Sequence, residues 1–167
     1  MAVDAAAEST LWADCLLTEG ERDRSAVFSP LGEARYALGL ETIYEGFLVH
    51  YGRPRLFAPT DDDTALLLGD YLYAHGVARI SALHEVAAVA DLAELISLCS
   101  QLRAEKSDDD GALWAATAAL LGRGALEDAR TDLRLHSDSL PLDAAARSAA
   151  GDEAVDAALA AHAARRA

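Results

Sequence analysis

The chain lacks several features by which a sequence shows its class. No run of about 20 apolar residues occurs, so we expect no membrane-spanning helix. The two cysteines, Cys15 and Cys99, fall inside apolar helical patterns without CxxC or Cys/His spacing, which favours reduced, buried thiols over a disulfide or a zinc site. The acidic first residues lack the basic flank of a signal peptide, so a cytoplasmic location is the default expectation.

Basic residues are also scarce. The chain has 14 of them against 28 acidic residues, which gives a formal net charge of −14, and Lys106 is its single lysine. So acidic a surface repels nucleic acid and anionic lipid, and we therefore expect neither as a partner. The simplest interpretation of the charge is solubility.

Aromatic residues make up only 6 % of the chain, whereas apolar residues make up 52 % and alanine is abundant. This composition favours helices that pack closely through small side chains. A length of 167 residues fits one domain that is large enough for a proper core. Trp12 and Trp114 are expected to be anchors of that core.

Helical periodicity runs through most of the chain, and the expected helices span residues 5–18, 29–51, 60–83, 84–104 and 108–122. Ser29 before a proline and Thr60 before three aspartates are the expected N-caps. The helix over 60–83 is apolar on most faces, so we expect it to be central and buried, with Gly69 and Gly76 allowing close helix–helix approach. Short loops between long helices predict an all-α, up-and-down helical bundle.

Beyond residue 126 the pattern changes. Residues 127–142 are polar and irregular, and residues 152–167 are alanine-rich with few large apolar side chains. We therefore expect a helical domain over residues 1–126 and an acidic, alanine-rich C-terminal extension over 127–167. The extension could be a docking arm for a partner, and its tail over 152–167 could also be a thin surface helix or partly disordered.

The segment ETIYEGFLVHYGRP (residues 41–54) contains the most informative spacing. Glu41 and Glu45 are four residues apart, so on a helix their carboxylates share one face and could bind a metal ion together. Glutamate pairs at this spacing also occur by chance on many helices. Arg53 and Arg55 follow the helix, and we expect them to be solvated loop cations.

This layout resembles the first aspartate-rich region of the trans-polyprenyl diphosphate synthases. That family has DDxxD, four residues, Arg-Arg-Gly-x-Pro, and a Gly-Asp pair on the next helix. Glu41 and Glu45 stand here at the outer aspartates, Thr42 at the middle one, His50 and Tyr51 at the arginines, and Gly52, Pro54 and Gly69-Asp70 keep their places. With GALWAATAALLG (residues 111–122), the resemblance covers about residues 36–122.

The resemblance implies a truncated, isoprenoid-synthase-like fold. It also implies that magnesium, if any is bound, is held by Glu41 and Glu45, with His50 and Arg53 near the diphosphate. That chemistry depends on delivering positive charge to the diphosphate.

The resemblance further places Asp70, Tyr71 and Leu72 in the wall of a cavity for the isoprenoid chain. From the residues alone, Asp70 stands in so apolar a helix that it should need a hydrogen-bond partner.

Several residues that the chemistry needs are changed or missing. His50 and Tyr51 cannot replace a bidentate arginine, and Asp109-Asp110 stands where the family has Lys-Thr. No second aspartate-rich motif follows Gly122. We therefore expect no cofactor and a non-catalytic, prenyltransferase-like accessory or structural subunit. It would act in a homodimer or in a heteromeric complex, including one bound to a membrane through protein contacts.

Two alternatives stay open. The chain could be a prenyl diphosphate synthase component that contributes half of a magnesium and diphosphate site. It could also bind an isoprenoid or quinone tail in an apolar cavity beside the Gly69-Asp70 helix.

Overall fold

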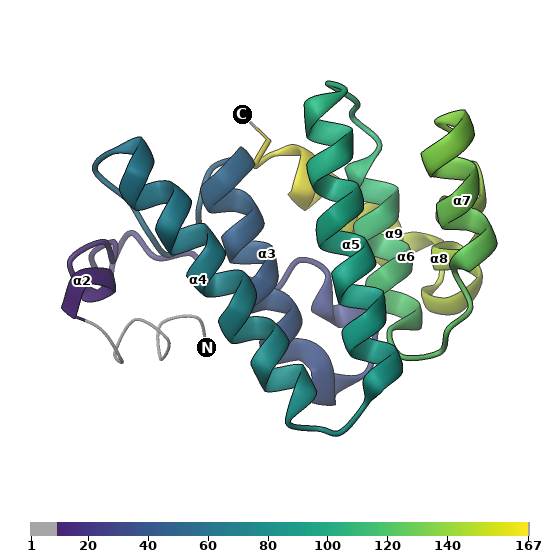
Figure 1. Cartoon of the computed structure of the whole chain (residues 1–167), viewed down its shortest axis with the longest axis horizontal. Helices are drawn as coiled ribbons and strands as arrows, with labels where there is room; N and C mark the ends of the chain where they lie inside the picture. The colour runs from purple at the N-terminus through teal and green to yellow at the C-terminus, as the bar shows by residue number, and fades with distance from the viewer. Residues whose placement is uncertain (1–9, 167) are drawn as a thin grey trace.

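In a computed structural model that describes residues 10–166, all regular elements are helical (Figure 1). The elements are α2 (Thr10–Ala13), the 3-10 turns η1 (Ser29–Leu31) and η2 (Ala34–Tyr36), α3 (Ala37–Tyr51), α4 (Asp62–Ser81), α5 (Val86–Ala104), α6 (Asp110–Leu120), α7 (Glu127–His136), α8 (Leu140–Ala150) and α9 (Asp152–Ala163). The all-α class is therefore confirmed. Within the described residues, no helix combines the length and the apolar character needed to cross a membrane.

Helices α3 and α4 form an antiparallel pair whose backbones lie unusually close. A Cβ atom added to Gly76 would lie 2.4 Å from the Ile43 side chain and 2.8 Å from the carbonyl oxygen of Gly39. Further along the pair, a Cβ on Gly46 would lie 2.9 Å from the carbonyl oxygen of Gly69. The prediction that Gly69 and Gly76 allow close helix–helix approach is thus confirmed, because no larger residue fits at these contacts.

Replacing Gly76 by alanine is expected to lower the free energy of unfolding by about 1–3 kcal/mol, because the new Cβ would overlap α3. In a helix without such a contact, the same change would stabilise by up to about 1 kcal/mol. Urea denaturation measures the difference. Ala78→Gly, on the exposed side of α4, is the control and should cost about 1 kcal/mol through helix propensity alone. A Gly76→Ala variant as stable as the wild type would contradict this packing.

The most buried helices are α3 and α6, which lie behind α4 and α5 in Figure 1. The prediction of a central, buried helix over residues 60–83 is therefore wrong. Helix α4 buries one stripe of residues against its neighbours: Leu68, Gly69, Leu72, Gly76 and Ile80. Leu66 and Leu67 on the same helix are exposed, so its apolar character overstates its burial.

Trp12 and Cys15 belong to a second, smaller apolar cluster that α2 forms with the start of α4 and with Phe57. The expected helix over residues 5–18 is shorter than predicted at its C-terminal end, because Leu17 N–H donates to the carbonyl oxygen of Leu56 at 3.0 Å. Residues 5–9 of that expected helix lie outside the described residues. Both cysteines are buried thiols and are not joined in a disulfide, as predicted.

The C-terminal helices are part of the main core. Leu133 of α7, Leu142 of α8 and Val155 of α9 are buried in the same apolar cluster as α3 and α6. The core therefore crosses residue 126, where the sequence predicted a boundary, and residues 127–136 form a helix instead of an irregular segment.

Helix α7 is held by a buried ion pair that its apolar pattern does not reveal. Arg130 Nη1 donates to Asp91 Oδ1 of α5 at 2.7 Å, and both side chains are buried. The other oxygen of Asp91 accepts the backbone N–H of Gly122 at 2.8 Å. Because arginine and aspartate usually lie on the surface of proteins, the sequence of α7 does not indicate a core helix.

Candidate functional site

The carboxylate of Glu45 on α3 is completely buried and fully hydrogen-bonded. Its Oε1 accepts the backbone N–H groups of Arg55 and Leu56, each at 2.8 Å. Its Oε2 accepts from Nε of Arg55 at 3.0 Å. A buried carboxylate is tolerated only with such partners, and all of them lie in the loop that follows α3.

Glu41, one helical turn earlier, binds a different part of the chain. Its Oε1 accepts three backbone N–H groups at 2.9–3.0 Å, from Val27, Phe28 and Ser29. Its Oε2 pairs with Nη1 of Arg55 at 2.7 Å. Glu41 therefore supplies the acceptor at the start of η1, where the sequence predicted the Ser29 side chain as the cap.

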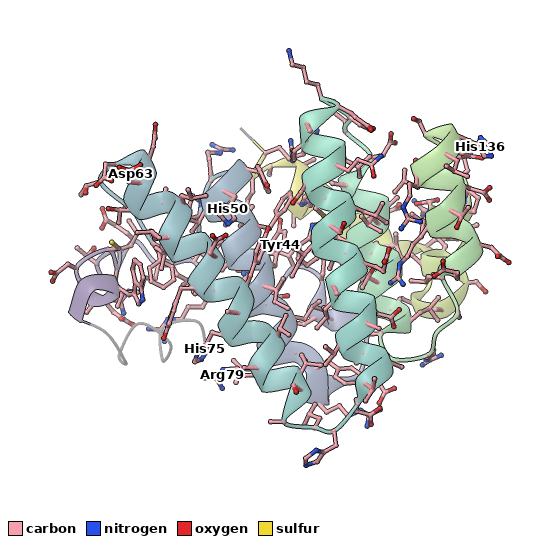
Figure 2. The ribbon with its side chains drawn as sticks, viewed as in Figure 1. Tyr44, His50, Asp63, His75, Arg79 and His136 are labelled. Atoms are coloured by element: carbon pink, nitrogen blue, oxygen red, sulfur yellow. The ribbon has the colours of Figure 1, made fainter. Side chains whose placement is uncertain are left out.

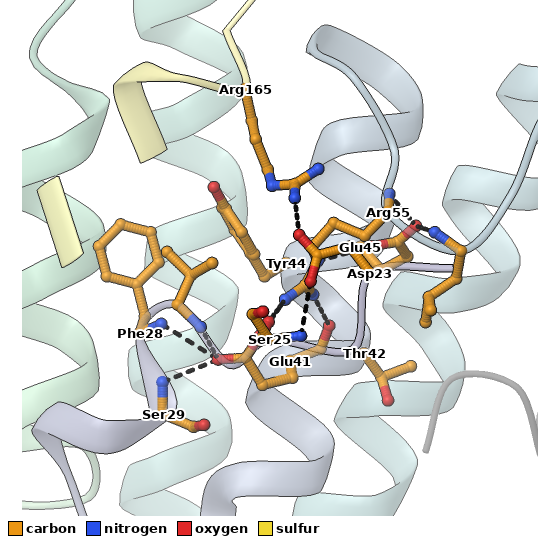
Figure 3. Close-up of polar contacts among 12 residues, drawn as sticks. Asp23, Ser25, Phe28, Ser29, Glu41, Thr42, Tyr44, Glu45, Arg55 and Arg165 are labelled. Atoms are coloured by element: carbon orange, nitrogen blue, oxygen red, sulfur yellow. Dashed lines mark hydrogen bonds and ion pairs between the residues drawn. The ribbon is translucent and has the colours of Figure 1, made fainter. Parts of the chain in front are cut away.

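Arg55 lies between the two glutamates and is 4 % exposed (Figure 3). Besides the two carboxylates, its guanidinium donates to the carbonyl oxygen of Ser25 at 2.7 Å. It also lies over the ring of Tyr44, 5.0 Å from the ring centre. The prediction that Arg55 is a solvated loop cation is wrong, because the turn after α3 brings it back over the face that carries Glu41 and Glu45.

This cluster of Glu41, Glu45 and Arg55 leaves none of the four carboxylate oxygens without a partner. Two negative charges face one positive charge, and five backbone N–H groups offset the excess. Among the described residues, no group of three or more His, Cys, Asp or Glu side chains is arranged to hold a metal ion. The cluster therefore ties α3 to the segments before and after it.

His50 contacts α4 and lies away from that cluster. Its Nε2 is 3.2 Å from Asp70 Oδ1, and its ring occupies the space where a Cβ of residue 69 would lie (Figure 2). Asp70 thus has the partner that the sequence predicted, although its own side chain is 68 % exposed. Burial lowers the pKa of His50, and the attraction of Asp70 only partly offsets this effect.

The lowered pKa of His50 predicts an acid-sensitive contribution to stability. A histidine whose pKa is lower in the folded than in the unfolded state contributes fully to stability at a pH above the unfolded pKa, here 6.5. This contribution is lost as the pH falls through the folded pKa. We therefore expect His50→Gln to reduce the loss of unfolding free energy between pH 7.5 and pH 5, measured by urea denaturation. His136→Gln, at an exposed position, is the control and should leave the loss unchanged. Equal losses in all three proteins would contradict the effect.

Arg53 contacts the end of the chain. Its guanidinium donates to the carbonyl oxygen of Ala164, and its backbone N–H donates to that of Arg165 at 2.8 Å. His50 and Arg53, which the family resemblance places near one diphosphate, therefore contact different segments, α4 and the residues after α9. Glu41 and Glu45, the candidate metal ligands, contact a third region.

The three residues expected in a cavity wall have different surroundings. Asp70 is exposed, whereas Tyr71 packs on Trp12 with ring centres 5.4 Å apart. Leu72 is completely buried in the smaller apolar cluster. Close packing of α3 against Gly69 fills the space beside Asp70 on that face.

A second buried polar group, which the sequence did not indicate, joins α3, α5, α6 and α9. The hydroxyl of Tyr44 lies 2.9 Å from His162 Nδ1, and His162 Nε2 lies 3.5 Å from Asp110 Oδ1. Nη2 of Arg103 donates to Asp110 Oδ2 at 2.5 Å. Burial raises the pKa of Tyr44, so the phenol stays protonated. The only sequence signal was a histidine inside the alanine-rich tail.

A pocket of about 270 Å³ lies beside the Glu41–Arg55 pair. Its walls come from residues 23–26, Ser29, the start of α3 and residues 55–56, and most of its lining is apolar. Ser25 and Ser29, which carry hydroxyl groups, also line the pocket. The pocket could take a small, largely apolar molecule, or one end of a longer molecule.

Comparisons with known proteins give no match: no family model, no curated protein and no solved structure resembles this chain to a significant degree.

Proposed function

We propose that this chain is a non-catalytic, prenyltransferase-like helical protein that acts as an accessory or structural subunit of a larger complex. The single observation that carries the proposal is the cluster of Glu41, Glu45 and Arg55. These glutamates keep the spacing of metal ligands, but a buried arginine and five backbone N–H groups occupy their oxygens.

The alternative of half a magnesium and diphosphate site requires a different arrangement. Glu45 would have to release two backbone N–H groups and the Arg55 side chain, and each buried donor left without an acceptor costs about 1–3 kcal/mol. His50 and Arg53 would also have to leave their partners to reach a common diphosphate. The family layout is thus best explained as descent, with a structural use of the same positions.

Two measurements on the pure protein test the proposal. We expect no prenyl transfer, and we expect millimolar magnesium to leave the thermal midpoint unchanged, because a ligand stabilises only the state that binds it. Turnover that Glu41→Gln abolishes would overturn the proposal, provided that this variant stays folded by circular dichroism. A magnesium-dependent rise of the midpoint that is lost in Glu41→Gln would point instead to the half-site.

The mass of the species purified from the native host tests the subunit role itself. The proposal predicts co-purification in a complex much larger than the 17.6 kDa chain. A monomer at every step of a gentle purification would contradict it.

The pocket of about 270 Å³ favours a second candidate function, binding of an isoprenoid or quinone tail or a similar apolar molecule. It is too small for a whole polyprenyl chain, so it would hold one end. Hexanol, hexanoate and hexylamine differ only in the head group, and ligand-observed NMR would rank them. Ala37→Leu at the pocket wall should abolish binding, whereas Ala87→Leu on the exposed side of α5 should not. Equal binding to both variants would exclude this pocket.

A further inference from the structure

The first half of α4 exposes two adjacent leucines inside an acidic frame. Leu66 is 55 % exposed and Leu67 is 58 % exposed. Asp61–Asp63 precede them, and Asp70 follows them with a largely exposed side chain. No lysine or arginine occurs between residues 56 and 78, so no basic residue of this segment offsets the acids.

Helical geometry places these side chains on one surface. Asp63, Leu67 and Asp70 are all exposed and follow one another at spacings of four and three residues, which is one face of a helix. Leu66 borders this face. Figure 2 shows Asp63 at the outer start of α4, on the side away from α6 and α9. The surface is therefore a continuous strip, apolar in the middle and acidic at its ends.

The acids have local roles that do not cover the leucines. Asp61 caps α4 by accepting the backbone N–H of Thr64 at 2.8 Å, and Asp70 pairs with His50. Leu66 and Leu67 contribute little to the fold, since the buried stripe of α4 lies on its other side. Large apolar side chains that lie exposed side by side on a soluble domain mark a contact surface more often than isolated ones do.

We propose that this strip of α4 docks a basic amphipathic helix of a partner protein. The inference rests on the proposed subunit function and names the partner's chemistry. A helix packs along another helix, with leucines against leucines. Lysine or arginine at its flanks would meet Asp61–Asp63 on one side and Asp70 on the other, which gives orientation and fast association.

A second copy of this chain fits the strip poorly. A two-fold contact sets the same patch against itself, so aspartates would face aspartates. Each copy also carries a formal net charge of −14, which adds repulsion over the rest of the surface. Charge complementarity therefore selects a basic partner instead of a homodimer at this surface.

The test uses a fluorescein-labelled helical peptide of leucine and lysine, about 18 residues or five turns long. Its binding to the full chain is followed by anisotropy. We expect the double variant Leu66→Ser/Leu67→Ser to weaken binding about tenfold or more through lost apolar burial. The control Leu135→Ser/Leu140→Ser removes two other exposed leucines and should change binding by less than about twofold. All three proteins have the same net charge, so non-specific attraction stays constant.

The acidic frame is tested separately with Asp63→Asn/Asp70→Asn, which should flatten the salt dependence of peptide binding. A matched peptide of leucine and glutamate should not bind. Equal weakening by the two leucine double variants would overturn the proposal. A wild-type dimer that dissociates in Leu66→Ser/Leu67→Ser would also overturn the proposal, because it would assign the strip to a second copy. Wild-type binding to phosphatidylcholine vesicles that the same variant loses would overturn it as well. If the native protein is monomeric, the subunit role fails, while the peptide result still decides the surface.

Discussion

Replacing Arg55 by methionine is expected to lower the free energy of unfolding by about 3–5 kcal/mol. The change removes the cation that pairs with two carboxylates, of which Glu45 is completely buried. An uncompensated buried charge is far more costly than the loss of an exposed ion pair. Urea denaturation at pH 7 measures the effect, and the size of the loss is a large part of the stability of a domain of this size.

Two further variants show that the charge, and not the side-chain volume, causes the loss. Arg53→Met, two residues away, removes an exposed arginine and should change the free energy of unfolding by no more than about 0.5–1 kcal/mol. Glu45→Gln should destabilise the wild type but stabilise the Arg55→Met background, because there it removes the unpaired charge and keeps an acceptor for the N–H groups of Arg55 and Leu56. The same sign in both backgrounds would contradict the structural role of the cluster.

Replacing Val155 of α9 by aspartate is expected to cost more than about 4 kcal/mol, because the new carboxylate would be placed in the main core without a partner. Val155 is 0 % exposed and belongs to the main apolar cluster, and its helix α9 contacts α6 and α8. Thermal and urea unfolding should both show the loss. The result distinguishes a C-terminal segment that completes the core from a docking arm that the rest of the chain does not need.

The control for this variant is Val86→Asp at the start of α5, where the valine is 82 % exposed. It makes the same chemical change and adds the same negative charge, so it should alter the free energy of unfolding by only about 0.5 kcal/mol. If the two variants were equally stable, α9 would not be part of the core and the expected extension over 127–167 would stand.

The arrangement of α9 also explains why the C-terminal residues hold several helices together. His162 on α9 meets Tyr44 of α3 and Asp110 of α6, and Arg165 pairs with Asp23. The chain end thus closes over the ends of α3 and of the segment before η1. The small alanine side chains of α9 allow it to pack closely on its neighbours, and its few polar residues form the specific contacts.

Most helices could be predicted from periodicity and from start and stop signals. The bounds of α5 and α6 agree with the predicted ranges within two residues, since each has a regular apolar stripe and a clear break at its ends. The sequence predicts no helix over α7, because its buried residues include only Leu133 and the charged Arg130 and a segment this polar resembles a loop. The sequence overstates the burial of α4, because apolar residues on most faces of a helix do not show which face packs against the core.

The candidate site was predictable in its geometry but not in its role. The spacing of Glu41 and Glu45 correctly placed both carboxylates on one face of α3. Whether that face meets a metal ion, water or an arginine depends on where the chain runs after Gly52. The return of Arg55 over α3 and the approach of the segment 23–29 are decided by packing between distant segments.

The sequence by itself determined the helical class, most helix positions, a close helix–helix approach at Gly69 and Gly76, and the shared face of Glu41 and Glu45. These properties are local, because they follow from periodicity and from the size of single residues. The tertiary structure alone decided the partners of the buried charges: Arg55 for Glu41 and Glu45, Arg130 for Asp91, and His162 for Tyr44 and Asp110. The physical reason is that charge neutralisation in a core depends on which segments meet, and most of these partners are far apart in the chain.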